Sequence, residues 1–309
     1  MKEYQIIIVG GGPAGLTAGL YTSRAHLTSL ILEAMVPSGQ AYNSEKIENY
    51  PGFPDGISGP ELIERFTAQA SKFGVEILPF TKVDNVELVQ QKKLLTSGDK
   101  QFSAPALIVA SGAQWNKLGV PGEDEYAGKG VSYCATCDGS FFKDQKVAVI
   151  GGGDTAIEDA LYLTRIADQV YVVHRRDQLR AQKVLQSKAF ENPRIEFVWN
   201  TVLREIRGQE TVRNLVLENV KTAEREELAV DGVFLAVGQR PNTDFVRGLV
   251  DLDEQGYIMT DENCGTSVAG ILAAGDVRQK SLRQISTAVG DGALAASAAE
   301  RYIEEHVQT

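Results

Sequence analysis

The chain begins with an apolar run whose pattern predicts a buried strand. Residues 4–9 (YQIIIV) are mostly apolar and rich in β-branched side chains, and the glycine-rich segment 10–15 (GGGPAG) follows at once. A helical pattern then extends through Leu20 and Tyr21, and a second apolar run covers Ser29–Leu32. This order of strand, glycine turn, helix and strand predicts a βαβ unit at the start of the chain.

The same order of elements returns about half a chain later. Residues 146–150 (KVAVI) predict a strand, 151–156 (GGGDTA) a glycine turn, 157–163 a helix, and 170–173 the next strand. Two such units favour two similar α/β domains over one large sheet.

Further apolar runs complete the expected domains. Residues 106–110 and 234–237 predict closing strands, and residues 270–273 predict a last strand, followed by an alanine-rich helix from about 288 to 303. No third nucleotide-binding unit follows Arg240, so we expect the tail to return to the first domain. The expected fold class is α/β, with two Rossmann-like, three-layer (ββα) nucleotide-binding domains, the second inserted in the first. The first would comprise residues 1–112 and 245–309, and the second residues 113–244.

Composition and charge exclude several classes of protein. The 309 residues include 31 basic and 41 acidic side chains, and the net charge of −10 disfavours a nucleic-acid partner. No apolar run approaches the roughly 18 residues of a membrane span. Only Lys2 and Glu3 precede the first apolar run, and three cysteines cannot form a disulfide framework, so we expect a cytoplasmic protein without a membrane contact.

The first glycine motif, Gly10-x-Gly12-x-x-Gly15, is typical of a dinucleotide site. Glycines allow a tight turn and a close approach of the backbone to a pyrophosphate, which then lies at the N-terminus of the following helix. Glu33, at the end of the second strand, is placed to accept a hydrogen bond from an adenosine ribose. The alternative is an ordinary glycine-rich turn, but the flanking strand, helix and acid favour the dinucleotide site.

The second motif, Gly151-x-Gly153-x-x-Ala156, differs from the first at the end of the following strand. Where the first unit has Glu33, the second has His174, Arg175 and Arg176, with Arg180 one turn later. Guanidinium groups bind a 2′-phosphate that a carboxylate would repel, so this unit is expected to prefer NADP(H). The alternative is a solvated basic turn. We interpret His174 as support for the backbone rather than as a catalyst.

A third signal is Cys134-x-x-Cys137, followed directly by Asp138. Two cysteines at this spacing can close a small disulfide ring, and the start of a helix stabilises a thiolate. A neighbouring carboxyl could move the proton that thiol–disulfide exchange requires. Half of a zinc site is the alternative, although only Cys264 remains as a further cysteine ligand. Cys264 itself is expected to be a small structural residue.

Together these motifs resemble those of the low-molecular-weight bacterial thioredoxin reductases, over essentially the whole chain. The segments that carry the resemblance are 10–15, 48–53 (ENYPGF), 134–139 (CATCDG), 151–156, 174–180 and 275–292. The resemblance implies FAD in the first domain, NADPH in the second, a homodimer, and thioredoxin as the protein substrate.

The resemblance also implies roles for individual residues. Cys137 would be the thiol next to the flavin, Cys134 the thiol that attacks the partner disulfide, and Asp138 the acid–base group. Lys129, Phe141 and Phe142 match positions that touch thioredoxin. The implied cofactor contacts, besides those above, are Pro13, Ala14, Gly39, Gln40, Asn49, Gly112, Asp154, Thr155, Gly275, Asp276, Arg283, Gln284 and Ala288.

The expected reaction passes two electrons from NADPH through FAD to the Cys134–Cys137 disulfide and then to a protein disulfide. Because Cys137 and Gly151 are near neighbours in the sequence, the disulfide and the nicotinamide site share one domain. We therefore expect a domain rotation between the half-reactions. The alternatives are a ferredoxin or flavodoxin reductase, which needs no CxxC, the reductase of a peroxide-reducing system, and a non-enzymatic redox scaffold.

Overall fold

The computed structural model describes residues 3–36, 39–44 and 46–307, which form two compact units. Unit 1 comprises residues 1–114 and 240–309, and unit 2 comprises residues 115–239. The expected α/β fold class is confirmed. The two connecting segments, β8 (Ala113–Trp115) and β17 (Gln239–Pro241), pair as a two-stranded sheet. Within the described ranges, no helix has both the length and the apolar character of a membrane span.

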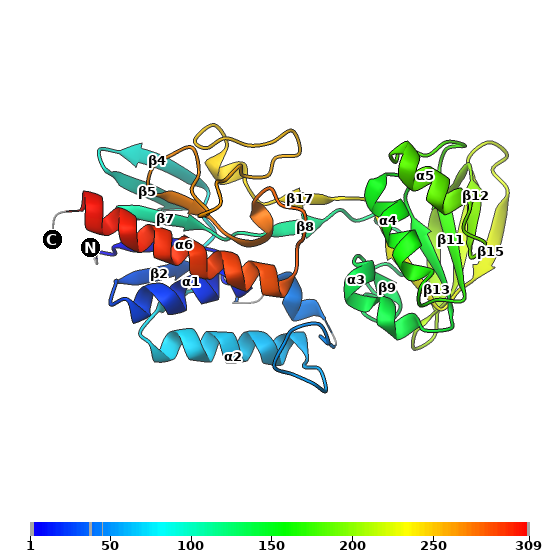
Figure 1. Ribbon diagram of the computed structural model, residues 1–309, viewed down its shortest axis with the longest axis horizontal. Coiled ribbons are helices and arrows are strands. Elements are labelled where there is room, and N and C mark those ends of the chain that lie inside the picture. The colour runs from blue at the N-terminus through cyan, green and yellow to red at the C-terminus, as the bar shows by residue number, and fades with distance from the viewer. Residues whose placement is uncertain (1–2, 37–38, 45, 308–309) are drawn as a thin grey trace. The chain divides into compact units, whose positions relative to one another are not determined.

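Unit 1 is built on a five-stranded parallel sheet in the order β18-β7-β1-β2-β3. Alternate side chains of β1 enter two different cores: Ile6 and Ile8 pack toward helices α1 and α6, and Ile7 and Val9 pack toward the β4–β6 sheet. Both faces are covered (Figure 1), which explains why the strand is apolar throughout. The strands are β1 (Ile6–Val9), β2 (Ser29–Leu32), β3 (Glu76–Leu78), β4 (Asn85–Val89), β5 (Lys92–Ser97), β6 (Lys100–Ala104), β7 (Ala106–Val109) and β18 (Ile271–Ala273).

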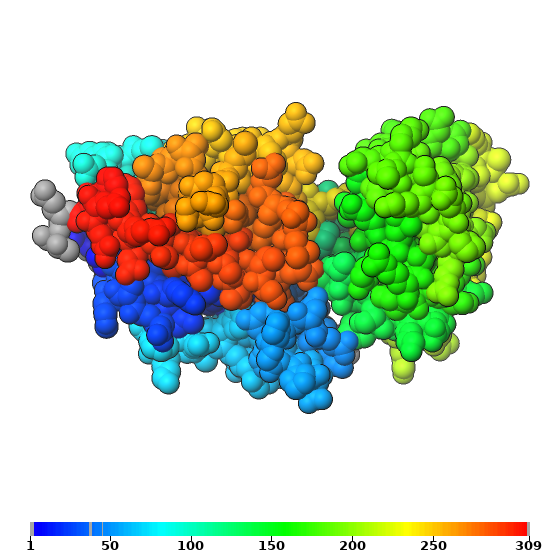
Figure 2. All heavy atoms as spheres, viewed as in Figure 1, coloured from blue at the N-terminus to red at the C-terminus, as the bar shows by residue number. Residues whose placement is uncertain are grey.

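The helices of unit 1 bring the two ends of the chain together. Helix α1 (Pro13–Arg24) packs against the last helix, α6 (Ile285–His306), and α2 (Gly59–Lys72) packs against α1. Figure 2 shows the first and last parts of the chain, in blue and red, side by side on the surface of this unit. Three short 3₁₀ helices complete it: η1 (Gln40–Asn43), η3 (Asp244–Val246) and η4 (Gly275–Val277).

Unit 2 repeats the three-layer plan with a parallel sheet in the order β12-β11-β10-β16-β9. Helices α3 to α5 cover one face, and an antiparallel sheet of three strands covers the other. The strands are β9 (Val131–Ser132), β10 (Lys146–Ile150), β11 (Gln169–His174), β12 (Ile195–Trp199), β13 (Thr201–Gly208), β14 (Val212–Asn219), β15 (Arg225–Ala229) and β16 (Gly232–Leu235). The helices are α3 (Ala135–Asp138), η2 (Gly139–Phe142), α4 (Asp154–Leu163) and α5 (Lys183–Phe190).

Several element boundaries differ from the sequence-based expectation; β1 begins at Ile6 rather than residue 4, for example, and α4 at Asp154 rather than residue 157. Two further differences have a clear cause. Helix α6 begins at Ile285 rather than near residue 288, because Gln284 and Thr287 form a capping box that starts the helix one turn earlier. Strand β16 covers residues 232–235 rather than 234–237, because Gly232 already pairs with Val147 of β10. In both cases, interactions beyond the apolar run set the boundary.

Candidate functional site

The first glycine turn lies between β1 and α1 and cannot accept larger side chains. Gly10 has a φ of +112°, and a Cβ there would lie 2.3 Å from the Ala110 carbonyl oxygen. A Cβ on Gly15 would lie 1.9 Å from the Gly10 carbonyl oxygen. Gly12 is the N-cap of α1, with Pro13 in the first turn. The turn therefore presents bare backbone at a helix N-terminus, which suits a pyrophosphate.

Glu33 follows β2 and already supports this turn. Its Oε2 accepts a hydrogen bond from the Gly11 amide at 2.5 Å, and its Oε1 accepts one from the Met35 amide at 3.1 Å. Each carboxylate oxygen has two lone-pair positions, so the side chain can still accept a bond from a ribose hydroxyl. Glu33 thus both orients the turn and remains a candidate ligand.

The loop around Gly39 packs against the same turn. A Cβ on Gly39 would lie 3.1 Å from the Cα of Gly12, so the two backbones approach closely. The Gln40 side-chain amide donates a hydrogen bond to the carbonyl of Ala113, the residue after Gly112. Gly112 has a φ of +68°. The structure therefore brings these predicted residues together around the first helix N-terminus.

The N-terminus of α6 adds a second group of predicted residues in unit 1. The Asn49 side-chain amide donates to the Gln284 side chain at 3.1 Å, and Gln284 is the N-cap of α6. Ala288 is buried in the first turns of this helix, and Ala14 is buried in α1. The Arg283 guanidinium lies 4.0 Å from the centre of the Tyr257 ring and donates a bond to the Asp276 carbonyl at 3.4 Å.

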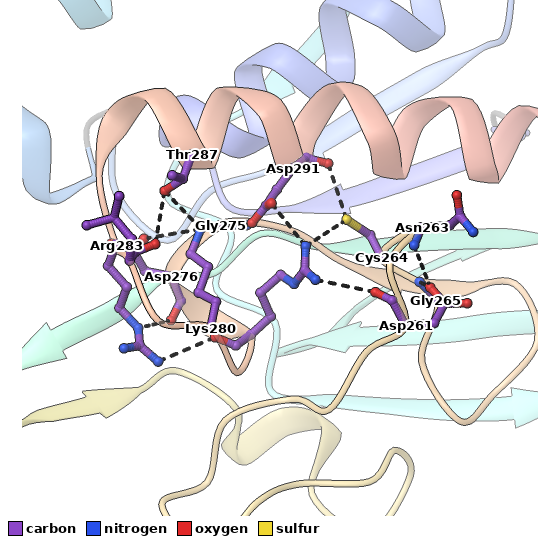
Figure 3. Close-up of polar contacts among 12 residues, drawn as sticks. Asp261, Asn263, Cys264, Gly265, Gly275, Asp276, Lys280, Arg283, Thr287 and Asp291 are labelled. Atoms are coloured by element: carbon purple, nitrogen blue, oxygen red, sulfur yellow. Dashed lines mark hydrogen bonds and ion pairs between the residues drawn. The ribbon is translucent and has the colours of Figure 1, made fainter.

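A charged cluster supports the turn that carries Asp276 (Figure 3). Asp291 of α6 accepts a hydrogen bond from the Gly275 amide at 3.0 Å, and it pairs with Arg278 at 3.0 Å and Lys280 at 2.8 Å. Lys280 also lies 4.0 Å from the Asp276 carboxylate. Asp276 Oδ1 is buried and has no hydrogen-bond partner among the described residues, and burial raises the pKa of this carboxyl. The atom is therefore available to a bound ligand.

Cys264 contacts the same cluster and is confirmed as a core residue. Its side chain is fully buried, and Sγ accepts a hydrogen bond from Arg278 Nη1 at 3.1 Å. Burial raises the pKa of the thiol to about 11. Such a thiol is protonated at neutral pH and is a poor nucleophile.

In unit 2 the second glycine turn lies between β10 and α4. Gly153 is the N-cap of α4, and a Cβ there would contact nothing within 4 Å. A Cβ on Gly151 would lie 2.7 Å from the Cβ of the buried Ala156. Asp154 and Thr155 are exposed in the first turn of the helix. This turn also presents open backbone at a helix N-terminus.

The basic residues after β11 line a hollow of about 420 Å³. Its lining includes Arg175, Arg176 and Arg180, together with Lys221 from the β14–β15 connection. The Arg180 amide donates to the Gly152 carbonyl at 2.7 Å, which ties the basic segment to the glycine turn. Sequence reasoning missed Lys221, which lies more than 40 residues from the arginines and outside any motif.

His174 fills the space above the second glycine turn. Its ring is buried, and a Cβ on Gly152 would lie 2.4 Å from it. Nε2 has no hydrogen-bond partner among the described residues, and burial lowers the pKa of the imidazole. The ring can therefore support the turn in its neutral form.

The two motif cysteines form a disulfide at the start of α3. Cys134 is the N-cap of this helix and is bonded to Cys137, with the two Cα atoms 5.3 Å apart. Asp138 follows directly, and burial raises the pKa of its carboxyl, whereas a hydrogen bond from Ser132 lowers it. A reducible bond and a carboxyl whose pKa is raised by burial therefore lie on adjacent residues.

The residues expected to touch a partner protein differ in exposure. Phe141 is 43% exposed and Lys129 is exposed as well. Phe142 is buried, with its ring edge against Phe234, and a Cβ on Gly232 would lie 2.2 Å from it. Phe142 therefore packs in the core of unit 2, and of the two phenylalanines only Phe141 is available to a partner in this structure.

Two glycine turns after parallel strands, together with a disulfide at a helix start, define a disulfide oxidoreductase that binds dinucleotides. The chain belongs to the pyridine nucleotide-disulphide oxidoreductase family, whose model matches residues 4–292.

Relatives within this family resemble the chain over its full length. The thioredoxin reductase of Bacillus subtilis is 48% identical over 311 residues, covering 100% of this chain and 97% of that protein. The thioredoxin reductase of Listeria innocua is 49% identical, covering 98% of this chain and 95% of that protein. The crystal structure of thioredoxin reductase from Streptococcus pyogenes has a TM-score of 0.95 at 49% identity, covering 98% of this chain and 99% of that one.

Proposed function

We propose that this chain is a thioredoxin reductase that uses NADPH as the electron donor and FAD as the carrier. The observation that carries the proposal is the Cys134–Cys137 disulfide at a helix start, with Asp138 beside it. The full-length similarity to thioredoxin reductases supports thioredoxin as the protein substrate. A ferredoxin or flavodoxin reductase does not require a redox-active disulfide.

The residues of unit 1 fit FAD. Gly10 and Gly15 leave no room for a Cβ, so the backbone of the turn is open to a pyrophosphate, and Glu33, which accepts the Gly11 amide, is the proposed acceptor for a ribose hydroxyl. The buried Oδ1 of Asp276 accepts no hydrogen bond from the described residues, so it suits a hydroxyl donor such as those of the ribityl chain. FAD supplies, when bound, a group that accepts a hydride and delivers two electrons to a disulfide. The remaining proposed contacts are Pro13, Ala14, Gly39, Gln40, Asn49, Gly112, Gly275, Arg283, Gln284 and Ala288.

The residues of unit 2 fit NADPH. The open N-terminus of α4, with Asp154 and Thr155 in its first turn, suits the pyrophosphate. The hollow lined by Arg175, Arg176 and Arg180 suits the 2′-phosphate that distinguishes NADPH from NADH. The ring of His174 packs against Gly152 and supports the turn.

The overall reaction consumes NADPH, one proton and a protein disulfide, and yields NADP⁺ and a dithiol. In the second half, the Cys134 thiolate attacks one sulfur of the partner disulfide and forms a mixed disulfide, and a thiolate leaves the partner. Cys137 then attacks the Cys134 sulfur, which restores the intramolecular disulfide and releases the second partner thiolate. Asp138 is the group that holds and transfers a proton during these exchanges.

Other expectations from the sequence stay predictions. These are the rotation between half-reactions, the homodimer and the cytoplasmic location.

A trapping experiment tests the roles of the two thiols. In Cys137→Ser, Cys134 should form a stable mixed disulfide with thioredoxin, because no second thiol remains to resolve it. Cys134→Ser should form no such adduct through its remaining thiol, and neither variant should sustain thioredoxin reduction. An adduct formed only through Cys137 would reverse the roles, and full activity of both variants would refute the dithiol mechanism.

The choice of substrate is tested separately. The wild-type protein should reduce DTNB with NADPH much faster when a purified thioredoxin is added, because thioredoxin carries the electrons onward. No stimulation by thioredoxin, with intact reduction of the chain's own disulfide, would favour a different protein disulfide as substrate.

A further inference from the structure

Ser132 lies between the redox disulfide and Asp138 and contacts both segments. It ends strand β9 and is buried, with 4% of its surface exposed. Its Oγ donates a hydrogen bond to Asp138 Oδ2 at 2.6 Å and accepts one from the Cys134 amide at 3.1 Å. A single hydroxyl thus bridges the first cysteine of the disulfide and the proposed acid.

The hydroxyl has a second acceptor within reach. Ser132 Oγ lies 3.4 Å from the Cys134 carbonyl oxygen. Because a hydroxyl has one proton, it can donate to either Asp138 or this carbonyl at one time. When Asp138 is ionised, its carboxylate takes that proton as a strong, charge-assisted bond. When Asp138 is protonated, the carboxyl becomes the donor to Oγ, and the hydroxyl proton can turn to the Cys134 carbonyl.

The surroundings of Asp138 leave Ser132 as its main polar contact. Among the described residues, the pKa of Asp138 is affected by burial and by Ser132, and by no charged group. Helix α3 packs against α4 and η2, and η2 has no ionisable side chain. The ionisable residues of α4 are Asp154, Glu158, Asp159 and Tyr162.

We propose that Ser132 is a positioning residue for proton transfer, which directs the Asp138 carboxyl and exchanges donor and acceptor with it as the proton moves. This inference rests on the proposed function, in which Asp138 transfers the proton during disulfide exchange. The bond from Ser132 stabilises the carboxylate, so its removal should leave the proton on Asp138 up to a higher pH.

The test compares Ser132→Ala with Ser132→Thr in the full chain with bound FAD. The titration of Asp138 is followed by NMR of protein labelled with 13C in the aspartate carboxyl, and Asp138→Asn identifies its signal. The loss of a hydrogen bond to a charged group shifts the pKa of that group by about one to two units. Ser132→Ala should shift two midpoints to a pH about one unit higher: that of the Asp138 titration, and that of the fall in turnover at alkaline pH (the alkaline limb). Ser132→Thr, which keeps a hydroxyl, should restore the wild-type values.

A matched control is Ser187→Ala, which removes a hydroxyl from the exposed face of α5 in the same unit. This variant should leave the midpoint pH of both the Asp138 titration and the alkaline limb unchanged. The KM for NADPH should stay unchanged in all three serine variants. If Ser132→Ala leaves either the titration or the limb in place while Asp138→Asn abolishes the limb, this inference is wrong and the proposed role of Asp138 stands. If Asp138→Asn leaves the limb in place, the proposed role of Asp138 itself is wrong.

Discussion

Replacing Asp291 by asparagine removes the shared charge of the cluster below the Asp276 turn. In the wild-type protein one carboxylate pairs with both Arg278 and Lys280 and accepts the Gly275 amide. Asparagine is nearly the same size and can still accept the amide proton through its carbonyl oxygen. The substitution therefore tests the two ion pairs, with little change in packing.

The burial of the cluster determines the size of the effect. The side chains of Asp291, Arg278 and Lys280 are only 12–13% exposed. Removing one partner of a buried ion pair costs about 3–5 kcal/mol, because the remaining charge loses its compensation. Two cations would lose their partner here, but each keeps some contact with water. We therefore expect the free energy of unfolding of unit 1 to fall by about 3 kcal/mol.

Unit 1 also provides a matched control on its surface. Asp244 pairs with Arg240 at 2.5 Å and Arg247 at 3.1 Å, the same arrangement of one carboxylate and two cations. Its side chain is 63% exposed. Exposed pairs contribute about 0.2–1 kcal/mol each, so the loss of both pairs in Asp244→Asn should lower stability by at most about 2 kcal/mol.

Urea unfolding can separate the two units because both tryptophans, Trp115 and Trp199, lie in unit 2. Release of FAD, followed by its fluorescence, reports unit 1, and tryptophan fluorescence reports unit 2. Asp291→Asn should lower the midpoint of FAD release strongly and affect the tryptophan transition less. Equal midpoints of FAD release for Asp291→Asn and Asp244→Asn would refute the reasoning that the buried cluster stabilises the Asp276 turn.

Three further predictions concern unit 2. Replacing Arg175 and Arg176 together by glutamine should raise the KM for NADPH by roughly tenfold or more and leave that for NADH unchanged in steady-state assays, since only NADPH loses charge-assisted bonds; equal effects would contradict the assignment. Asp138→Asn should slow turnover with FAD content and NADPH affinity unchanged, and loss of FAD would instead indicate a structural role. Gly152→Ala should lower the free energy of unfolding without nucleotide by about 1–3 kcal/mol, because its Cβ would meet the buried imidazole at 2.4 Å, whereas Gly153→Ala should not.

The sequence predicted seven of the ten parallel strands, which are buried on both faces, and missed β3, β9 and β12, of which β9 has two residues and the other two are only partly buried. Strands β2 and β10 are apolar apart from their first residues, so their limits in the structure match the expected ones. The antiparallel sheets β4–β6 and β13–β15 gave no such signal. Their strands mix charged and apolar residues, and their register depends on partners that the pattern does not reveal.

The residues of the candidate site also fall into two groups: those that a sequence motif identifies and those that only the folded structure brings together. Motif residues such as Gly10 and Cys134 were found because their chemistry depends on neighbours in the sequence. Ser132 and Lys221 were not, because their roles depend on contacts made after folding. Asp291 could have been noticed in the sequence, because it is a single charged residue within the alanine-rich stretch of α6. Such a charge is most simply explained by pairing with a buried partner.

The two glycine turns share one backbone motif but differ in the side chain that packs on them, which fits the two nucleotides proposed above. In unit 1, Glu33 accepts the Gly11 amide, so a negative charge lies where a 2′-phosphate would have to enter. In unit 2 the ring of His174 takes the corresponding place against Gly152, and the charge at the end of the strand changes sign with Arg175. A carboxylate in place of the imidazole would sit beside the arginine hollow and compete with a phosphate for the guanidinium groups. If unit 2 binds a 2′-phosphate as proposed, the residue that packs on its turn should not be negatively charged, and an imidazole meets this requirement; burial lowers the pKa of His174, which favours the neutral ring.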